Sequence, residues 1–403
     1  MQPIQWKENT MPRSDDRYLQ LMSEANVQRA LRFHQSFPQY AVTPLVALQK
    51  MAALLGLQAL CVKDESYRFG LNAFKVLGGS YAMARYIAGE LHRDVESVDY
   101  AYLTSDRLRR EFGQATFFTA TDGNHGRGVA WAARQLGQKA VVHMPKGSVR
   151  ARFDNIAREG AQVTIEDVNY DDCVRIAARE AAQTPHGVVV QDTAWAGYED
   201  IPGYIMQGYG TMAHEAADQF EQAAGGAPTH VFVQAGVGSL AAAVQGYLQN
   251  RYAAKPPVVT VVEASAADCL YRGAAAGDGS PRVVEGDLST IMAGLACGEP
   301  NTIGWDILRN HTAFFLSCPD WVSAKGMRML GAPLKGDAQV ISGESGAVGM
   351  GVIAALMLDP AYAALRARMG LGADSRVLLF STEGDTDPEN YRRIVWDGAC
   401  ASL

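Results

Sequence analysis

The chain has 403 residues, of which 48% are hydrophobic and 20% charged, and its formal net charge is −7 at pH 7. This length suits two or three domain units with a large core. The acidic balance argues against nucleic acid or an anionic membrane surface as a partner. No apolar stretch is long enough to span a bilayer, and the first 16 residues do not resemble a signal peptide.

Short apolar runs alternate with helical patterns along almost the whole chain. Strands are predicted at 59–63, 116–120, 139–144, 162–165, 187–191, 230–234, 258–263 and 376–381. Helices are predicted at 16–33, 45–55, 80–91, 127–136, 148–159, 171–183, 203–223, 240–250, 305–309, 321–330, 347–357 and 360–369. The remainder of the first 40 residues is expected to be irregular, and 273–285 is expected to be a surface loop.

This alternation predicts an α/β protein with mostly parallel sheets. Two sheets are expected, with a small α/β domain at 81–190 inserted into a large domain formed by 1–80 and 191–403. The six cysteines are scattered and form no close pair. That pattern predicts reduced thiols in a cytoplasmic protein, with no disulfide framework and no structural metal.

Lys75 lies where a turn-rich run passes into the helix predicted at 80–91, with Phe74 and Val76 beside it. A lysine in apolar sequence often extends its stem along the surface so that its ammonium reaches water. Alternatively, burial and nearby positive charge lower its pKa, and the neutral amine can form a Schiff base. For Lys75 alone the first interpretation is favoured, and the loops further along the chain reverse it.

Ligands collect at the carboxyl ends of strands in parallel sheets, and the first unusual loop at such an end is 234–240. Gly236 and Gly238 let backbone N–H groups approach an anion at a helix N-terminus, which favours phosphate. A plain tight turn explains this motif equally well. A dinucleotide site is a third alternative, because Ala241 completes G-x-G-x-x-A and Glu263 ends the next strand, where a ribose-binding carboxylate belongs.

Two further strand ends carry polar loops. Asp122 and Asn124 lie at a helix start that could bind a carboxylate, although a capped helix is the simpler interpretation. Ser381 and Thr382 follow the last predicted strand, where a hydroxyl could contact a ring nitrogen or merely belong to a polar turn.

The lysine, the Gly-Asn-His turn, the glycine loop and the C-terminal Ser-Thr occur in the order typical of one family. They resemble the fold-type II (tryptophan-synthase-β) pyridoxal-phosphate enzymes, which include threonine and serine dehydratases, over nearly the whole chain. The resemblance implies two parallel-sheet α/β domains with the cofactor in the cleft between them. It also implies a small amino-acid substrate and a homodimer.

Some segments are similar in particular to the diaminopropionate ammonia-lyases, namely 72–81, 120–126, 191–195 and 381–387. Two carboxylates separate this group from the dehydratases: Asp122, where dehydratases usually carry a small residue, and Asp192, which precedes an aromatic-rich loop. The implied substrate, 2,3-diaminopropionate, carries an additional ammonium that carboxylates would suit. A serine or threonine dehydratase of the same family remains the alternative, and a nicotinamide dehydrogenase is a distant one.

The resemblance implies three catalytic residues and an elimination that yields pyruvate and two ammonia. Lys75 would hold the cofactor as a Schiff base and then remove the α-proton of the L-isomer while the cofactor absorbs the charge. Asp122 would be the base for the D-isomer. Asp192 would bind the β-ammonium or protonate it as it leaves. His125 is expected to be structural.

The resemblance also implies the cofactor contacts. Asn124 would contact the phenolic oxygen, and Ser381 or Thr382 the pyridine nitrogen, which a neutral hydroxyl leaves unprotonated. The phosphate would be bound by backbone N–H groups of the glycine loop. The remaining contacts are Phe74, Gly236, Val237, Gly238, Ser239 and Leu240.

Overall fold

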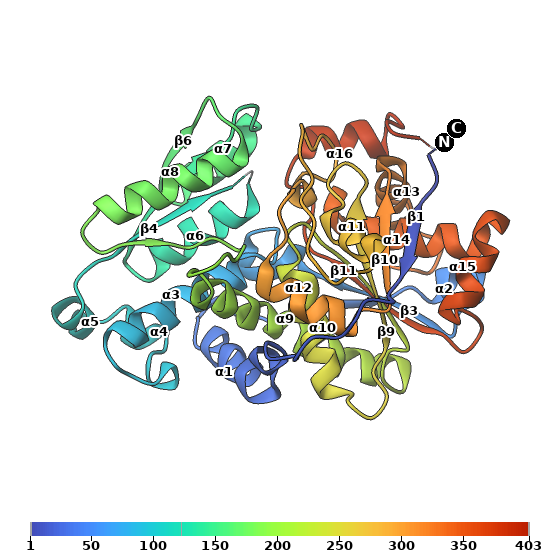
Figure 1. The fold of residues 1–403 in the computed structure, drawn as a ribbon, viewed down its shortest axis with the longest axis horizontal. Helices are drawn as coiled ribbons and strands as arrows, with labels where there is room; N and C mark the ends of the chain where they lie inside the picture. Colours follow the sequence, from blue (N-terminus) through green and yellow to red (C-terminus); the bar gives the residue numbers. More distant parts are fainter. Residues whose placement is uncertain (1, 122, 402–403) are drawn as a thin grey trace. The chain divides into compact units, whose positions relative to one another are not determined.

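The computed structural model describes residues 2–121 and 123–401, and they form an α/β fold with two sheets (Figure 1). The seven-stranded sheet has the order β1 (Gln5–Glu8), β10 (Phe314–Cys318), β9 (Val258–Ala264), β8 (His230–Gln234), β11 (Arg376–Ser381), β3 (Ala59–Asp64) and β2 (Leu45–Ala47). Its interior strands are parallel, and only the edge strands β1 and β2 pair antiparallel. The four-stranded sheet is parallel throughout, with the order β6 (Gln162–Ile165), β5 (Lys139–Met144), β4 (Thr116–Ala120) and β7 (Gly187–Val189).

Helices follow the strands, as parallel pairing requires. In the first half they are α1 (Glu24–Gln35), α2 (Gln49–Leu55), α3 (Val76–Glu90), α4 (Tyr100–Leu103), α5 (Asp106–Glu111), α6 (Asn124–Gln135), α7 (Arg150–Arg158), α8 (Tyr170–Gln183) and α9 (Asp200–Ala224). In the second half they are α10 (Ser239–Arg251), α11 (Cys269–Ala276), α12 (Thr302–His311), α13 (Asp320–Gly331), α14 (Glu344–Leu358), α15 (Ala363–Met369) and α16 (Pro388–Val395). Both α6 and α8 pack against the central strands of the four-stranded sheet (Figure 1).

The chain forms two compact units. The large unit comprises Met1–Ser23, Val42–Ala73 and Met212–Leu403, and the small unit comprises Glu24–Ala41 and Phe74–Thr211. The small unit therefore includes residues 24–41, 74–80 and 191–211, which the sequence pattern places in the larger domain.

Contacts between helices account for this difference. His34 of α1 lies 2.8 Å from the Thr211 hydroxyl and 3.0 Å from the Leu77 carbonyl oxygen. Gly208 of α9 approaches α3 so closely that a Cβ there would lie 2.4 Å from the same carbonyl oxygen. Such contacts join segments far apart in the chain, so no local pattern reveals them.

Most strands follow the prediction, and five have the predicted bounds, at 116–120, 139–144, 162–165, 230–234 and 376–381. Other elements differ from the prediction. The helix expected at 45–55 begins as β2, which pairs with β3, and the helix expected at 16–33 begins only at Glu24. The first residues of the loop expected at 273–285 belong to α11, and β1, β10 and α16 are not predicted at all.

Among the described residues, no single helix is long and apolar enough to cross a membrane. In this described part of the chain, one pair of helices, α14 and Pro360–Met369, together reach that length and composition, and they are bent by 90°.

Helices α13 and α14 pack together through glycine. A Cβ on Gly326 would lie 2.0 Å from the Ala347 carbonyl oxygen, and one on Gly351 would lie 1.8 Å from the Val322 carbonyl oxygen. Real side chains cannot approach backbone atoms so closely, so both positions require glycine while the two helices keep their spacing.

We therefore predict that Gly351→Ala lowers the free energy of unfolding by about 1–3 kcal/mol, because one additional methyl group must push the two helices apart. Urea denaturation measures this change. The matched control is Gly89→Ala near the end of α3, where a Cβ meets no atom within 4 Å. That variant should be neutral or gain up to about 1 kcal/mol, since alanine is the better helix former. Similar losses in both variants would contradict the packing argument.

Candidate active site

Lys75 lies at the start of α3 in the small unit and forms an ion pair with Asp192. The lysine precedes Val76, the first residue of the helix, and its ammonium donates a hydrogen bond of 2.6 Å to Asp192 Oδ2. The Asp192 side chain is 6% exposed and that of Lys75 is 22% exposed. Asp192 follows β7, at the carboxyl end of the parallel sheet, where ligands commonly bind. The structure therefore brings together two of the three predicted catalytic residues.

Asp192 remains ionised despite its burial. Burial by itself raises the pKa of the Asp192 carboxyl, but the charges of Lys75 and His125 and the hydrogen bond from Lys75 outweigh it and lower the pKa to about 2. A carboxylate in this position attracts ammonium groups, whether from Lys75 or from a ligand.

His125 is the second basic neighbour of this carboxylate. Its Nε2 lies 2.8 Å from the Val190 carbonyl oxygen, and its Nδ1 lies 3.9 Å from Asp192 Oδ2. A carbonyl oxygen only accepts hydrogen bonds, so Nε2 must carry the hydrogen and the ring is held with Nδ1 toward the carboxylate. The bond to Val190 fits the structural role expected of His125, and the contact with Asp192 adds an electrostatic one.

Phe74 and Tyr209 form an aromatic wall beside the ion pair. Their ring centroids are 4.7 Å apart, and both side chains are buried. Burial, with a smaller contribution from the Asp192 charge, raises the pKa of the Tyr209 hydroxyl, so it stays protonated. A Cβ on Gly78 would lie 2.6 Å from the Tyr209 ring. Sequence reasoning missed Tyr209, because it belongs to the apolar pattern of α9 and has no motif of its own.

The turn that contains Asn124 opens α6 in the small unit. Gly123 is the N-cap residue, and Asn124 is the first residue of the helix. The Thr121 hydroxyl accepts hydrogen bonds from the N–H groups of Gly123 at 2.9 Å and Gly126 at 3.1 Å. Asn124 is therefore not the N-cap that the simpler interpretation allowed it to be. Asp122 lies outside the described residues.

The glycine loop lies between β8 and α10 in the large unit. Gly238 has φ +100°, and a Cβ there would lie 3.3 Å from side-chain carbons of Leu270 and Leu308. Gly238 is the N-cap residue of α10, and as a glycine it provides no side-chain cap. Backbone N–H groups of a glycine turn at a helix N-terminus favour an anion, so the backbone of 236–240 fits a phosphate group.

Glu263 argues against the dinucleotide alternative for this loop. Its carboxylate accepts hydrogen bonds from the N–H groups of Leu270 at 2.9 Å and Tyr271 at 2.6 Å, at the start of α11. The side chain is fully buried, and burial raises its pKa well above the usual range. Glu263 is thus part of the fold of the large unit and does not face a ribose.

Ser381 and Thr382 lie at the end of β11 in the large unit, and both are buried. The Ser381 hydroxyl donates to the Ser342 hydroxyl at 2.8 Å, and the Thr382 hydroxyl accepts from Gln234 at 2.8 Å. Gln234 directly precedes the glycine loop, so this loop and Thr382 share one hydrogen-bond network. Ser381 contacts the Ser342 hydroxyl and the Glu383 carbonyl oxygen, and Thr382 contacts the Gln234 amide. All three partners are neutral groups, as a contact to an unprotonated ring nitrogen would need.

Glu344 and Glu383 connect the same region to α14. Glu344 is the first residue of α14 and accepts a hydrogen bond from the Asn390 amide. The Glu383 carboxylate accepts the N–H of Ser345 at 3.1 Å. Acidic side chains at a helix N-terminus are favoured by the helix dipole, so both fit a structural role.

Comparison with known proteins identifies the class that this arrangement belongs to. The model of the family described as "Pyridoxal-phosphate dependent enzyme" matches residues 37–382. The chain therefore belongs to the pyridoxal-phosphate dependent enzymes, and its cofactor is pyridoxal phosphate.

Within this family the chain is similar to diaminopropionate ammonia-lyases. The enzyme of that name from Salmonella typhimurium is 53% identical over 372 residues, which are 92% of each chain. A crystal structure of the Escherichia coli enzyme in complex with an aminoacrylate–PLP azomethine reaction intermediate has a TM-score of 0.89 and 48% identity, and it covers 100% of this chain and 99% of that one. A second crystal structure of that enzyme, in complex with D-serine, also has a TM-score of 0.89, at 48% identity over 99% of this chain and 98% of that one.

The Lys75–Asp192 ion pair should make the unfolding free energy of the apoenzyme depend on pH in the acid range. The folded pKa of Asp192 is about 2 and its ordinary value is 3.8, so the group contributes stability above the ordinary value that is lost as the pH falls toward 2. The shift corresponds to about 2 kcal/mol.

We predict that the difference in unfolding free energy between the unmodified apoenzyme and Asp192→Asn shrinks as the pH falls from 6 toward 3. Urea denaturation at several pH values measures it, with Asp218→Asn in the more exposed pair with Arg251 as the control. A difference that stays constant over this range would contradict the assigned pKa.

Proposed function

We propose that this protein catalyses the α,β-elimination of 2,3-diaminopropionate, as the L- and the D-isomer, to pyruvate and two ammonia. The observation that carries the proposal is the buried Asp192 carboxylate 2.6 Å from the Lys75 amine. A substrate with a second ammonium needs such a carboxylate, whereas serine and threonine do not. The similarity to diaminopropionate ammonia-lyases over most of the chain supports the same substrate.

Each side chain has a defined task in this proposal. Lys75 is the group that attaches the cofactor, and after the substrate amine has taken its place it removes the α-proton of the L-isomer. Asp192 binds the β-ammonium and keeps it oriented for departure. The bound cofactor supplies the electron sink for the charge left at Cα. Release of ammonia and addition of one water then give pyruvate and the second ammonia.

The remaining site residues bind the cofactor. The N–H groups of Gly236, Val237, Gly238, Ser239 and Leu240 hold the phosphate, and Phe74 packs beside the ring. Asn124 contacts the phenolic oxygen, and a hydroxyl of Ser381 or Thr382 meets the pyridine nitrogen. An enzyme of this family without the two carboxylates would instead suit a hydroxyl substrate, which is the dehydratase alternative.

The proposal extends to assembly and location. A homodimer follows from the resemblance to the family. The cytoplasm follows from the scattered cysteines, all six of which are free thiols. Small amino acids are the expected partners, with neither nucleic acid nor a membrane.

The proposal predicts a yellow holoenzyme in which borohydride attaches the cofactor covalently to Lys75. Peptide mass spectrometry of the reduced protein locates the attachment, and Lys75→Ala is the control that should lose it while remaining folded. Pyruvate and ammonia formation from each pure isomer, compared with L-serine and L-threonine, tests the substrate. Faster turnover of serine or threonine would instead identify a dehydratase.

A second prediction separates the two faces of the substrate. A base on one face of the cofactor–substrate plane cannot reach the proton on the other, so the D-isomer needs a base other than Lys75. Asp122→Asn should reduce turnover of D-diaminopropionate by about 10²–10⁴-fold, the usual effect of losing a general base, and affect the L-isomer much less.

Asp192→Asn is the comparison for this experiment, because both isomers need their β-ammonium bound and both should lose activity. Equal losses on the two isomers for Asp122→Asn would reduce Asp122 to a substrate-binding carboxylate.

A further inference from the structure

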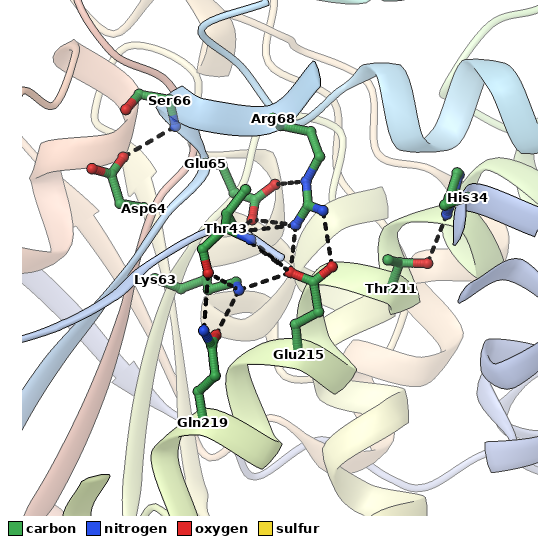
Figure 2. A network of polar contacts seen from close by, with 10 residues as sticks. All are labelled: His34, Thr43, Lys63, Asp64, Glu65, Ser66, Arg68, Thr211, Glu215 and Gln219. Atoms are coloured by element: carbon green, nitrogen blue, oxygen red, sulfur yellow. Dashed lines mark hydrogen bonds and ion pairs between the residues drawn. The ribbon is translucent and has the colours of Figure 1, made fainter. Parts of the chain in front are cut away.

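The connection between β3 and α3 leads directly into Lys75, and its first part is anchored by a buried cluster of charges in the large unit (Figure 2). Arg68 donates to Glu65 at 2.8 Å and, through two nitrogens, to both oxygens of Glu215 at 2.9 and 2.7 Å. Lys63 donates to Glu215 at 2.8 Å. These four side chains are at most 3% exposed. Two cations and two carboxylates satisfy one another, which is the condition under which buried charges are tolerated.

The last part of the connection is anchored a second time, by Asn72. Its carbonyl oxygen accepts the N–H of Gly384 at 3.0 Å, and its side-chain amide donates to Asp385 Oδ1 at 3.1 Å. The next residue, Ala73, forms an antiparallel bridge with Glu383. We call these contacts of Asn72 and Ala73 with residues 383–385 the Asn72 latch.

The latch is closely fitted. Asn72 has φ +59°, a backbone conformation that asparagine tolerates better than most residues. A Cβ on Gly384 would lie 2.1 Å from the Asn72 side-chain oxygen, so any other residue there would displace the Asn72 amide. A residue with positive φ, Asn72, thus contacts a glycine in a tightly packed position, Gly384. Such a combination indicates that the fold holds this segment in a defined position.

The latch joins two segments that carry proposed cofactor contacts. Residues 383–385 follow directly after Ser381 and Thr382, and only Ala73 and Phe74 separate Asn72 from Lys75. Two residues allow little independent movement, so the latch fixes the point from which the chain runs into Lys75.

We propose that Asn72 is a positioning residue for Lys75, and that the latch holds the lysine-bearing segment ready before the cofactor binds. This inference rests on the proposed function only in taking Lys75 as the residue that attaches the cofactor. An ordered segment binds its ligand without first losing conformational freedom, so release of the latch should weaken cofactor binding.

Asn72→Gly is the central variant, because glycine keeps the positive φ and removes only the side chain. Asp385→Ala removes the partner, and Asp385→Asn keeps an acceptor oxygen. Tyr67→Ala is the matched control, since Tyr67 belongs to the same connection and is 66% exposed. All variants are compared as apoenzymes by pyridoxal-phosphate titration, by the rate at which an acylating reagent modifies Lys75, and by urea denaturation.

We expect Asn72→Gly and Asp385→Ala each to weaken cofactor binding by about 3- to 10-fold, the range for one lost hydrogen bond. Both should change the modification rate of Lys75 in the apoenzyme. The double variant should be no worse than either single one, because both remove the same contact. Asp385→Asn and Tyr67→Ala should behave as the unmodified protein does.

Two results would overturn the inference. One is a loss of unfolding free energy in Asn72→Gly and Asp385→Ala without any change in cofactor affinity or Lys75 reactivity, which would make the latch merely structural. The other is additive effects in the double variant. If the unmodified holoenzyme fails to form pyruvate from diaminopropionate, the proposed function is wrong, and the apoenzyme measurements still decide the role of the latch.

Discussion

The ion pair between Lys75 and Asp192 is the contact on which the chemistry of the small unit depends. The Asp192 carboxyl is buried, and it stays charged chiefly because the Lys75 ammonium lies 2.6 Å away and His125 Nδ1 lies 3.9 Å away. If Lys75 attaches the cofactor as proposed, its amine is no longer a free ammonium beside this carboxylate. A buried carboxylate without a cation is costly, so the site then favours a ligand that brings its own ammonium.

In the large unit, in contrast, one cluster of buried charges is paired within the protein. Lys63, Arg68, Glu65 and Glu215 form a closed cluster in which each charge meets an opposite one, and the hydroxyl of Thr43 fills a remaining gap by donating to Glu65 at 2.6 Å. Such a cluster has nothing to offer a ligand, because binding there would break existing pairs. A charge cluster that is complete within the protein supports the fold, whereas one that ligand binding leaves incomplete supports function.

Much of the fold could be predicted because parallel strands are buried on both faces and therefore read as continuous apolar runs. The two edge strands lack such a run. No residue of β1 is buried, and β2 has only three residues and lies next to a helix. β10 is fully buried but is also absent from the prediction, since only Thr312 and Ala313 separate it from α12 and neither is a turn signal.

The site was predictable to the extent that its residues lie in local motifs. Lys75 and Asp192 belong to such motifs, and the structure places them in contact. Tyr209 and the Asn72 latch could not be predicted in this way, because each depends on a contact with a distant part of the chain. For the start of α6, the sequence narrows the choice of capping residue but does not decide it, since Thr121, Asp122 and Asn124 are all plausible caps by residue type. Only the geometry shows that the Thr121 hydroxyl accepts the bonds.

The glycine loop shows why a motif needs its acidic partner before it indicates a ligand. Glycines between a strand and a helix N-terminus bind phosphate in dinucleotide enzymes and pyridoxal-phosphate enzymes alike, because both use the same backbone N–H groups. The difference lies at the end of the next strand. A ribose-binding carboxylate must face the ligand, but Glu263 points into the start of α11 and accepts two backbone hydrogen bonds there. Because that carboxylate belongs to the fold, the loop fits a phosphate but has no ribose-binding carboxylate beside it. This combination suits a cofactor with one phosphate and no sugar.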